Sequence, residues 1–201
     1  MPETIVNKVL NKIKKCGRGS VFFPSDFVTY GSSKAVNKVL ERLTIDGTLL
    51  RVAHGIYCYP KIEKHYGLGA IPATPDEIAQ AIAKRSGAHI IPTGEWAQYQ
   101  LGLTQQIPMN YVYLTDGSSR KITLSDNQTI VFKHTSPKYF TIYDRLGALL
   151  VTALKDWKIE TLSDEQKHTI HTLIKEHGSF STDTLKRMPI ALREMIKQIT
   201  D

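Results

Sequence analysis

The sequence predicts an α+β fold in two domains, and three observations lead to this expectation. At 201 residues the chain is long enough for two small domains. Helical apolar spacing recurs near both ends, while residues 111–135 carry short strand patterns divided by turns. Residues 1–64 hold 11 Lys and Arg against 5 Asp and Glu, whereas the rest of the chain holds 15 against 14. We therefore expect a basic domain at residues 1–64 and a nearly neutral one at 74–201, and residues 61–73 look like a linker.

Two helices are expected before residue 31. In residues 3–15 the apolar side chains repeat at helical spacing and the lysines lie off that stripe. Gly17 suits the end of this helix. A short second helix should run from Pro24 to Tyr30, because proline fits a first helical position and Asp26 lies in the positively charged first turn. Gly31 is the expected turn residue.

A third, amphipathic helix should follow this turn. It begins at Ser32 or Ser33, whose hydroxyl can cap it, and Gly47 ends it. One face is apolar and the other is polar and largely basic. The apolar face is formed by Ala35, Val36, Val39, Leu40 and Leu43. The polar face is formed by Ser33, Lys34, Asn37, Lys38, Glu41 and Arg42.

Two strands, Leu49–Ala53 and Ile56–Tyr59, should then pair around the tight-turn signal His54-Gly55. Such a strand pair after three helices is a wing. The region therefore predicts a winged helix-turn-helix, which places its recognition helix in the major groove of DNA. The local excess of positive charge suits the neutralisation of phosphates.

The polar face and the wing supply the candidate DNA contacts. Lys34, Lys38 and Arg42 suit phosphate contacts, and Asn37 or Arg42 has the donors needed to read a base edge. The alternatives are an ordinary solvated helix face and, for His54, a mere turn residue. The candidate DNA-binding residues are Ser32, Ser33, Lys34, Asn37, Lys38, Arg42, Arg51 and His54.

The second domain should be mixed α/β, with a small antiparallel sheet and several helices. Capping-box spacing marks two helix starts, Thr74 to Glu77 and Ser163 to Gln166. The turns between the strands of residues 111–135 are spaced as in a β-meander. Strands are expected at His89–Ile91, Tyr111–Thr115, Arg120–Leu124 and Thr129–Thr135. Helices are expected at residues 74–86, 95–101, 139–154, 163–177, 181–188 and 190–199.

A second candidate partner surface lies on the expected meander, at Arg120, Lys121, Lys133 and His134. Because alternation along a strand places neighbours on opposite faces, ordinary exposed strand residues are the alternative. Asp116-Gly117 is interpreted as a hairpin turn. No apolar run approaches the length of a membrane span and the first residues lack a cleavage signal, so we expect a cytoplasmic protein with no membrane partner.

Enzymatic and metal chemistry find little support in the sequence. It contains no phosphate-binding glycine loop, no GxSxG and no HExxH, so we expect no enzyme, no catalytic residue and no cofactor. His168 and His171 are spaced as metal ligands on a helix, but a third ligand such as His177 would face elsewhere, and we interpret them as solvated. Cys16 and Cys58 are too far apart for a CxxC pair, which argues against a zinc site or a disulfide framework.

A family resemblance adds to this interpretation. The pattern G-S-x-x-A-V-x-x-x-L-x-R-L-x-x-x-G-x-L-x-R-V-x-x-G-I-Y-x-x-P, from Gly31 to Pro60, resembles the amino-terminal domain of AbiEi-type antitoxins. Those proteins often carry an arginine before the wing glycine, where this chain has His54. Trp96–Pro108, the Y-L-T-D-G stretch through Arg120, and Phe132–Pro137 also resemble AbiEi-like proteins, so the likeness spans roughly residues 5–145.

The resemblance implies an antitoxin of a bacterial type IV toxin–antitoxin, or abortive-infection, system. In that family the first domain represses the shared promoter, and the second counters a nucleotidyltransferase-like toxin. The expected partners are then the chain's own promoter, as double-stranded DNA, and the cognate toxin, reached directly or indirectly, with a homodimer on DNA as an open alternative. A stand-alone winged-helix regulator with an effector or dimerisation domain, and a nucleic-acid-processing enzyme, are the competing hypotheses.

Overall fold

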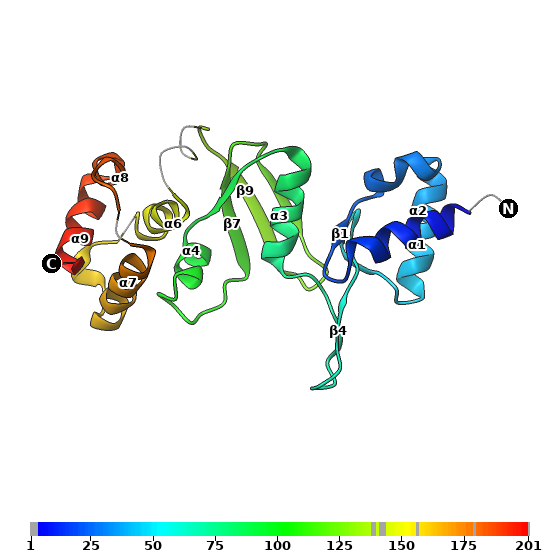
Figure 1. Cartoon of the computed structure of the whole chain (residues 1–201), viewed down its shortest axis with the longest axis horizontal. Coiled ribbons are helices and arrows are strands. Elements are labelled where there is room, and N and C mark those ends of the chain that lie inside the picture. Colours follow the sequence, from blue (N-terminus) through cyan, green and yellow to red (C-terminus); the bar gives the residue numbers. More distant parts are fainter. Residues whose placement is uncertain (1–3, 138–139, 141–143, 156, 179, 201) are drawn as a thin grey trace. The chain divides into compact units, whose positions relative to one another are not determined.

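The computed structural model describes residues 4–137, 140, 144–155, 157–178 and 180–200, and the α+β class expected from the sequence is confirmed (Figure 1). The chain divides into two compact units. The first contains the chain up to Ile82 together with Ile122–Gln128, and the second contains Ala83–Lys121 and the chain from Thr129 onward. The first unit thus takes in residues 65–82 and a segment from the middle of the chain, beyond the expected limit of 64.

Three helical elements and a small sheet open the first unit. The helical elements are α1 (Ile5–Cys16), the 3-10 helix η1 (Pro24–Tyr30) and α2 (Ser33–Ile45). The strands are β1 (Val21–Phe22), β2 (Leu50–Ala53) and β3 (Ile56–Cys58), paired antiparallel in the order β1-β3-β2. The expected helices and the strand pair therefore lie within one or two residues of their predicted bounds. The strand β1 was not expected.

The core of this part is built from the apolar stripes of the helices. Val9 and Ile13 of α1 and Phe27 of η1 are fully buried in one core cluster with the apolar side chains of α2, and Figure 1 shows α1 and α2 side by side. On α2 the buried side chains are Val36, Val39, Leu40 and Leu43, and Ala35 is half-buried. The division of α2 into an apolar and a polar face is therefore confirmed.

The segment expected to be a linker is a β-hairpin instead. Strands β4 (Lys61–Glu63) and β5 (Gly69–Ile71) pair antiparallel, with Lys61 opposite Ile71. The carboxylate of Glu63 accepts hydrogen bonds from backbone N–H groups of the turn, including that of Tyr66 at 2.8 Å. These strand-pairing and turn hydrogen bonds order a stretch whose mixed polar composition alone suggested a loop.

Helix α3 (Pro75–Ser86) starts at the predicted capping box. The Thr74 N–H donates to Glu77 Oε2 at 2.8 Å, and the Glu77 N–H donates to Thr74 Oγ1 at 3.2 Å. The inserted segment 122–128 joins the same unit through Ser125. Its N–H donates to the Val52 carbonyl at 2.9 Å, and its hydroxyl donates to the Arg51 carbonyl at 2.8 Å.

The second unit contains helix α4 (Glu95–Gln100) and most of a four-stranded sheet, whose strand β8 (Arg120–Thr123) ends in the inserted segment of the first unit. The other strands are β6 (Ile90–Pro92), β7 (Asn110–Thr115) and β9 (Thr129–His134), and the order is β6-β7-β9-β8. β6 and β7 pair antiparallel, but β7 and β9 pair in parallel, with Tyr113 opposite Phe132. The predicted meander, with β8 between its neighbours, is therefore wrong. Burial explains the order: Ile130 and Phe132 of β9 are buried, as a central strand requires, while β8 is mostly exposed at the edge.

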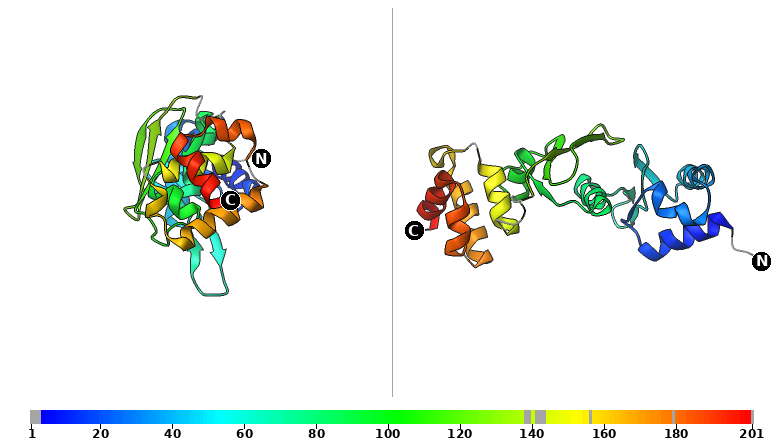
Figure 2. Two further views of the ribbon diagram at one scale, coloured as in Figure 1. Left: turned by 90° about the vertical axis from the view of Figure 1, so that its left-hand side faces the viewer. Right: turned by 90° about the horizontal axis from the view of Figure 1, so that it is seen from above.

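Helices complete the second unit, grouped toward the carboxyl end (Figure 2). They are α6 (Arg145–Leu154), η2 (Ile159–Thr161), α7 (Asp164–His177), α8 (Thr182–Arg187) and α9 (Ile190–Thr200). The predicted capping box of α7 is present, with Ser163 Oγ accepting from the Gln166 N–H at 3.2 Å. A helix was expected at residues 139–154, and α6 forms its later part; residues 139 and 141–143 of that range lie outside the described residues. Within the described ranges, no helix is both long enough and apolar enough to cross a membrane.

Candidate nucleic-acid interface

The outer face of α2 presents a row of polar side chains to solvent. Lys34, Asn37, Lys38 and Arg42 are all exposed, as is Ser33 at the first position of the helix. Lys34 and Lys38 are four residues apart, as are Lys38 and Arg42, so the three cations follow one side of the helix. The inner face is buried in the core, which fixes the orientation of the outer one. The helix therefore carries side chains that have the length and donors to reach a groove.

Ser32 has a structural task at the start of this helix. Its hydroxyl accepts a hydrogen bond from the Ala35 N–H at 3.3 Å, as an N-cap residue does. The side chain is exposed, so its O–H remains able to donate to another group. Of the two predicted serines, Ser32 is thus the cap and Ser33 is the first helical residue.

Little within the described part of the chain neutralises the cations of α2. Lys34 and Lys38 form no ion pair there. Arg42 lies near Asp46, the residue that ends the helix. Hydrogen bonds from Thr48 mainly hold the pKa of Asp46 below its ordinary value, and the charge of Arg42 adds to this effect. The positive charge of Lys34 and Lys38 is therefore free to meet an external anion.

The two other candidates of this unit meet at the β2–β3 turn. The Arg51 guanidinium donates from Nη2 to Nδ1 of His54 at 3.0 Å. Because a guanidinium has no acceptor, Nδ1 must carry the lone pair, and the neutral ring then bears its proton on Nε2. Both side chains are exposed. Gly55 has a φ of 68°, a left-handed conformation that glycine adopts without strain and that the tight turn requires.

The second candidate surface is divided between two strands. Arg120 and Lys121 lie on the edge strand β8, and Lys133 and His134 end β9. All four are exposed, but two of them serve the fold. The Arg120 guanidinium lies 5.0 Å from the centroid of the Phe132 ring and donates to Ser86 Oγ at 3.4 Å. Partial burial of the guanidinium against these neighbours, and to a smaller extent the charge of Arg85, lowers the pKa of Arg120.

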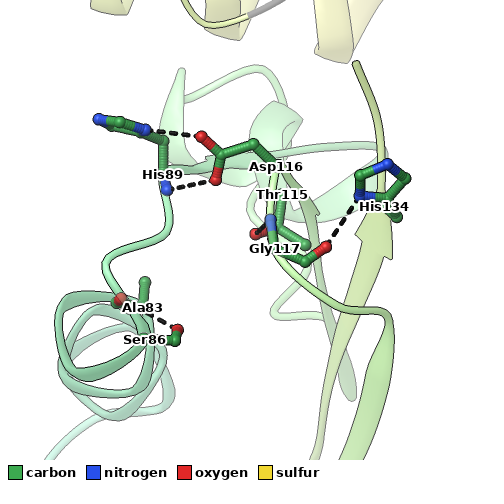
Figure 3. Close-up of polar contacts among 7 residues, drawn as sticks. All are labelled: Ala83, Ser86, His89, Thr115, Asp116, Gly117 and His134. Atoms are coloured by element: carbon green, nitrogen blue, oxygen red, sulfur yellow. Dashed lines mark hydrogen bonds and ion pairs between the residues drawn. The ribbon is translucent and has the colours of Figure 1, made fainter. Parts of the chain in front are cut away.

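His134 is fixed at the end of β9. Its Nδ1–H donates to the Gly117 carbonyl at 2.9 Å (Figure 3). Its backbone N–H donates to Ser119 Oγ at 2.9 Å. Arg120 and His134 therefore have partners within the fold, whereas Lys121 and Lys133 form no ion pair within the described residues. The structure therefore does not bring the four residues together into one charged group.

A family comparison covers most of the chain. Residues 8–181 match the model of a family of unknown function (DUF6088). The chain belongs to the DUF6088 family. The matched span contains α2, the β2–β3 turn and the whole sheet of the second unit. No curated protein sequence matches the chain.

One polar pair of this DUF6088 protein was not anticipated. Asp116, expected only as a turn residue, accepts from the His89 N–H and from the His89 ring, both at 2.7 Å (Figure 3). The ring hydrogen bond, helped by the backbone N–H, holds the pKa of Asp116 below its ordinary value. The two residues are 27 positions apart, so no local sequence signal announces the pair. It ties the chain before β6 to the turn after β7.

Among the described residues, no group of three or more His, Cys, Asp or Glu side chains is arranged to hold a metal ion. His168 is exposed and His171 half-buried on α7, where they line a surface hollow with Glu160 and Lys167. Cys16 is exposed and Cys58 is buried, and the Cys58 sulfur accepts from the Ala73 N–H at 3.2 Å.

Proposed function

We propose that the protein is the antitoxin of a bacterial type IV toxin–antitoxin system. In this proposal it binds its own promoter as a transcriptional autorepressor and counteracts a nucleotidyltransferase-like toxin. The elements η1, α2 and the β2–β3 pair would act as a winged helix-turn-helix, with α2 as the recognition helix. The family resemblance supports the antitoxin role, and the α2 surface supports the DNA-binding role.

The observation that carries the proposal is the composition of the exposed α2 face. Lys34, Lys38 and Arg42 outnumber Glu41, the one acidic side chain of this helix, so its exposed face is net positive. Lys34 and Lys38 form no ion pair in the described chain, and Asn37 is exposed on the same helix. Lysines of this kind suit phosphates, and an exposed amide suits adenine, to which it can bind bidentately.

The wing adds a second contact to the proposed interface. Arg51 and the Nε2–H of His54 present donors but no charged acceptor to solvent. The hydrogen bond between them fixes the two side chains in relation to each other. This arrangement suits a phosphate or the minor groove beside the recognition helix.

Duplex binding by the full chain tests the DNA-binding role. We expect affinity for promoter DNA to fall steeply as salt rises from about 50 mM to about 200 mM, because phosphate contacts release counterions. Changing Lys34 and Lys38 together to Ala should weaken binding to all duplexes alike. Asn37→Ala should instead relax the preference at one base pair by about 1–3 kcal/mol. A matched control, Lys175→Ala with Lys186→Ala, removes two exposed lysines of the second unit and should leave binding unchanged.

Co-expression with the nucleotidyltransferase-like gene that the proposal places beside this one tests the antitoxin role. The variant with Lys34, Lys38 and Arg42 all changed to Ala is expressed from an independent promoter. It should no longer repress a reporter gene under its own natural promoter, yet it should still protect cells from the toxin. Loss of protection by a folded and abundant triple variant would contradict the separation of the two roles. Absence of a nucleotidyltransferase gene from the neighbourhood would favour the second candidate.

That second candidate is a stand-alone winged-helix regulator that responds to an effector. A mainly apolar crevice of about 330 Å³ lies in the first unit, near the lower end of the usual size of ligand sites. Its walls come from the end of α2, from β2, from residues 72–78 and from residues 124–126. Arg51 lines this crevice and is also a proposed DNA contact, so an occupant there would affect the wing directly. Toxin-independent repression that changes with a small apolar metabolite would support this role.

A further inference from the structure

A basic hollow lies beside α1, and none of the residues assigned to DNA so far lines it. It has a volume of about 850 Å³, and none of the described residues that line it is acidic. The lining residues are Lys8, Asn11, Lys12, Lys15, Cys16, Thr29 and Tyr30. They come from α1 and from the end of η1, the 3-10 helix that directly precedes α2.

The spacing of three lysines places them along one side of α1. Lys8, Lys12 and Lys15 follow at intervals of four and three residues, so their side chains lie on neighbouring turns. The apolar side chains Val9 and Ile13 face the core and turn this side of the helix outward. Lys8 and Lys15 are exposed, and neither forms an ion pair within the residues that the structure describes.

Lys12 is held in place between the two elements. Its Nζ donates to the Asp26 carbonyl at 2.5 Å and lies 5.4 Å and 5.8 Å from the ring centroids of Phe27 and Tyr30. An ammonium has three donors, and the carbonyl takes one of them. The contacts therefore fix a positive charge at the wall of the hollow, and the exposed Lys8 and Lys15 extend it along α1.

We propose that this α1–η1 hollow binds backbone phosphates of duplex DNA that flank the segment read by α2. The inference rests on the proposed DNA-binding function and adds contact residues to it. Charge complementarity favours a polyanion, because the described lining residues carry three ammonium groups and no carboxylate. In a helix-turn-helix the element before the recognition helix crosses the DNA backbone, and η1 is that element here.

The dimensions of the hollow suit a row of phosphates. Lys8 and Lys15 are seven residues apart, which is about 10 Å along a helix axis. One DNA strand carries a phosphate about every 3.4 Å of duplex axis, so two or three phosphates fit along this length. Thr29 and Tyr30 bring hydroxyl groups to the same hollow, and such groups commonly donate to phosphate oxygens.

The test compares two double variants of the full chain. Lys8→Ala with Lys15→Ala removes the two exposed lysines of the hollow and leaves Lys12 to join α1 to η1. Lys14→Ala with Lys64→Ala is the matched control, because both are exposed lysines of the first unit outside the hollow. Circular dichroism and thermal melting establish that both variants are folded. Fluorescence anisotropy with a labelled promoter duplex, over a salt series, measures affinity.

We expect the slope of log K against log salt to become shallower by about 1.8 for the hollow variant, since each lost phosphate contact removes about 0.9. If the variant and the unchanged protein bind equally at about 1 M salt, this change in slope makes the variant about 60-fold weaker at about 0.1 M salt. The loss should be equal for promoter and unrelated duplexes. It should also shrink on a duplex shortened at the end that faces the hollow, because the phosphates in question are then missing.

Each further outcome has a distinct meaning. If the unchanged protein binds no duplex at low salt, the proposed function itself fails. If Lys34 and Lys38 matter for binding while the hollow variant behaves like its control, the phosphate assignment alone is overturned. If the hollow variant binds DNA normally but no longer protects cells from the toxin, the assignment is likewise overturned, and an acidic protein surface becomes the occupant.

Discussion

One buried hydrogen bond should account for a measurable part of the stability of the second unit. Nε1 of Trp96, on α4, donates to the Tyr113 hydroxyl of β7 at 2.9 Å. Tyr113 is fully buried and Trp96 is 8% exposed. Tyr113→Phe removes the hydroxyl oxygen and keeps the ring, whose centroid lies 5.8 Å from that of Phe132. The change therefore tests the hydrogen bond with little effect on packing.

The expected cost follows from what the substitution leaves behind. The indole N–H loses its acceptor in a site that water does not reach, and an unsatisfied buried donor costs about 1–3 kcal/mol. Because phenylalanine fills nearly the same volume, no large cavity penalty is added. We therefore expect the free energy of unfolding to fall by about 1–3 kcal/mol.

Urea denaturation followed by tryptophan fluorescence is the suitable assay. The chain has two tryptophans, Trp96 and Trp157, and both belong to the second unit. Tyr99→Phe is the matched control. The Tyr99 ring stacks on Trp96 with 5.6 Å between the ring centroids, and the Tyr99 hydroxyl has no hydrogen-bond partner in the described part of the chain. The control should change stability by less than about 0.5 kcal/mol. Equal effects of the two substitutions would refute the reasoning.

Three further predictions concern stability. Leu40→Ala, at a fully buried position of α2, should cost about 2–5 kcal/mol in denaturant unfolding, whereas Glu41→Ala on the exposed face should cost less than about 0.5 kcal/mol. Burial raises the pKa of Glu77, but hydrogen bonds, chiefly from Lys61, outweigh it and leave the pKa below 4.5. The stabilisation is therefore present above pH 4.5 and is lost as the pH falls through the folded pKa, so Glu77→Gln should flatten the acid-side decline in stability measured from about pH 6 to about pH 3. Ser163→Ala should destabilise α7 by about 1 kcal/mol in thermal melts, and Ser163→Asp should retain most of the cap.

Some features of this protein are determined by the sequence over short distances. The capping boxes at Thr74 and Ser163 and the buried face of α2 were all predictable, because each depends on residues three or four positions apart. The same holds for the exposure of Lys34 and Lys38, which follows from helical periodicity once the apolar face is known. Local hydrogen bonds and side-chain spacing need no knowledge of the rest of the chain.

Other features depend on contacts between distant residues. The parallel pairing of β7 with β9 depends on which strand becomes buried, and equal turn intervals do not distinguish the two possible strand orders. The Ser125 contacts with β2 and the His89–Asp116 pair each join residues that lie far apart in the chain. The sequence predicted only the lysines of the basic hollow, which lie off the apolar stripe of the first helix. Its other wall, at Thr29 and Tyr30, comes from a separate element and could not be predicted from that stripe. Such sites are decided by tertiary packing, since burial and long-range pairing set the strand order and bring distant side chains together.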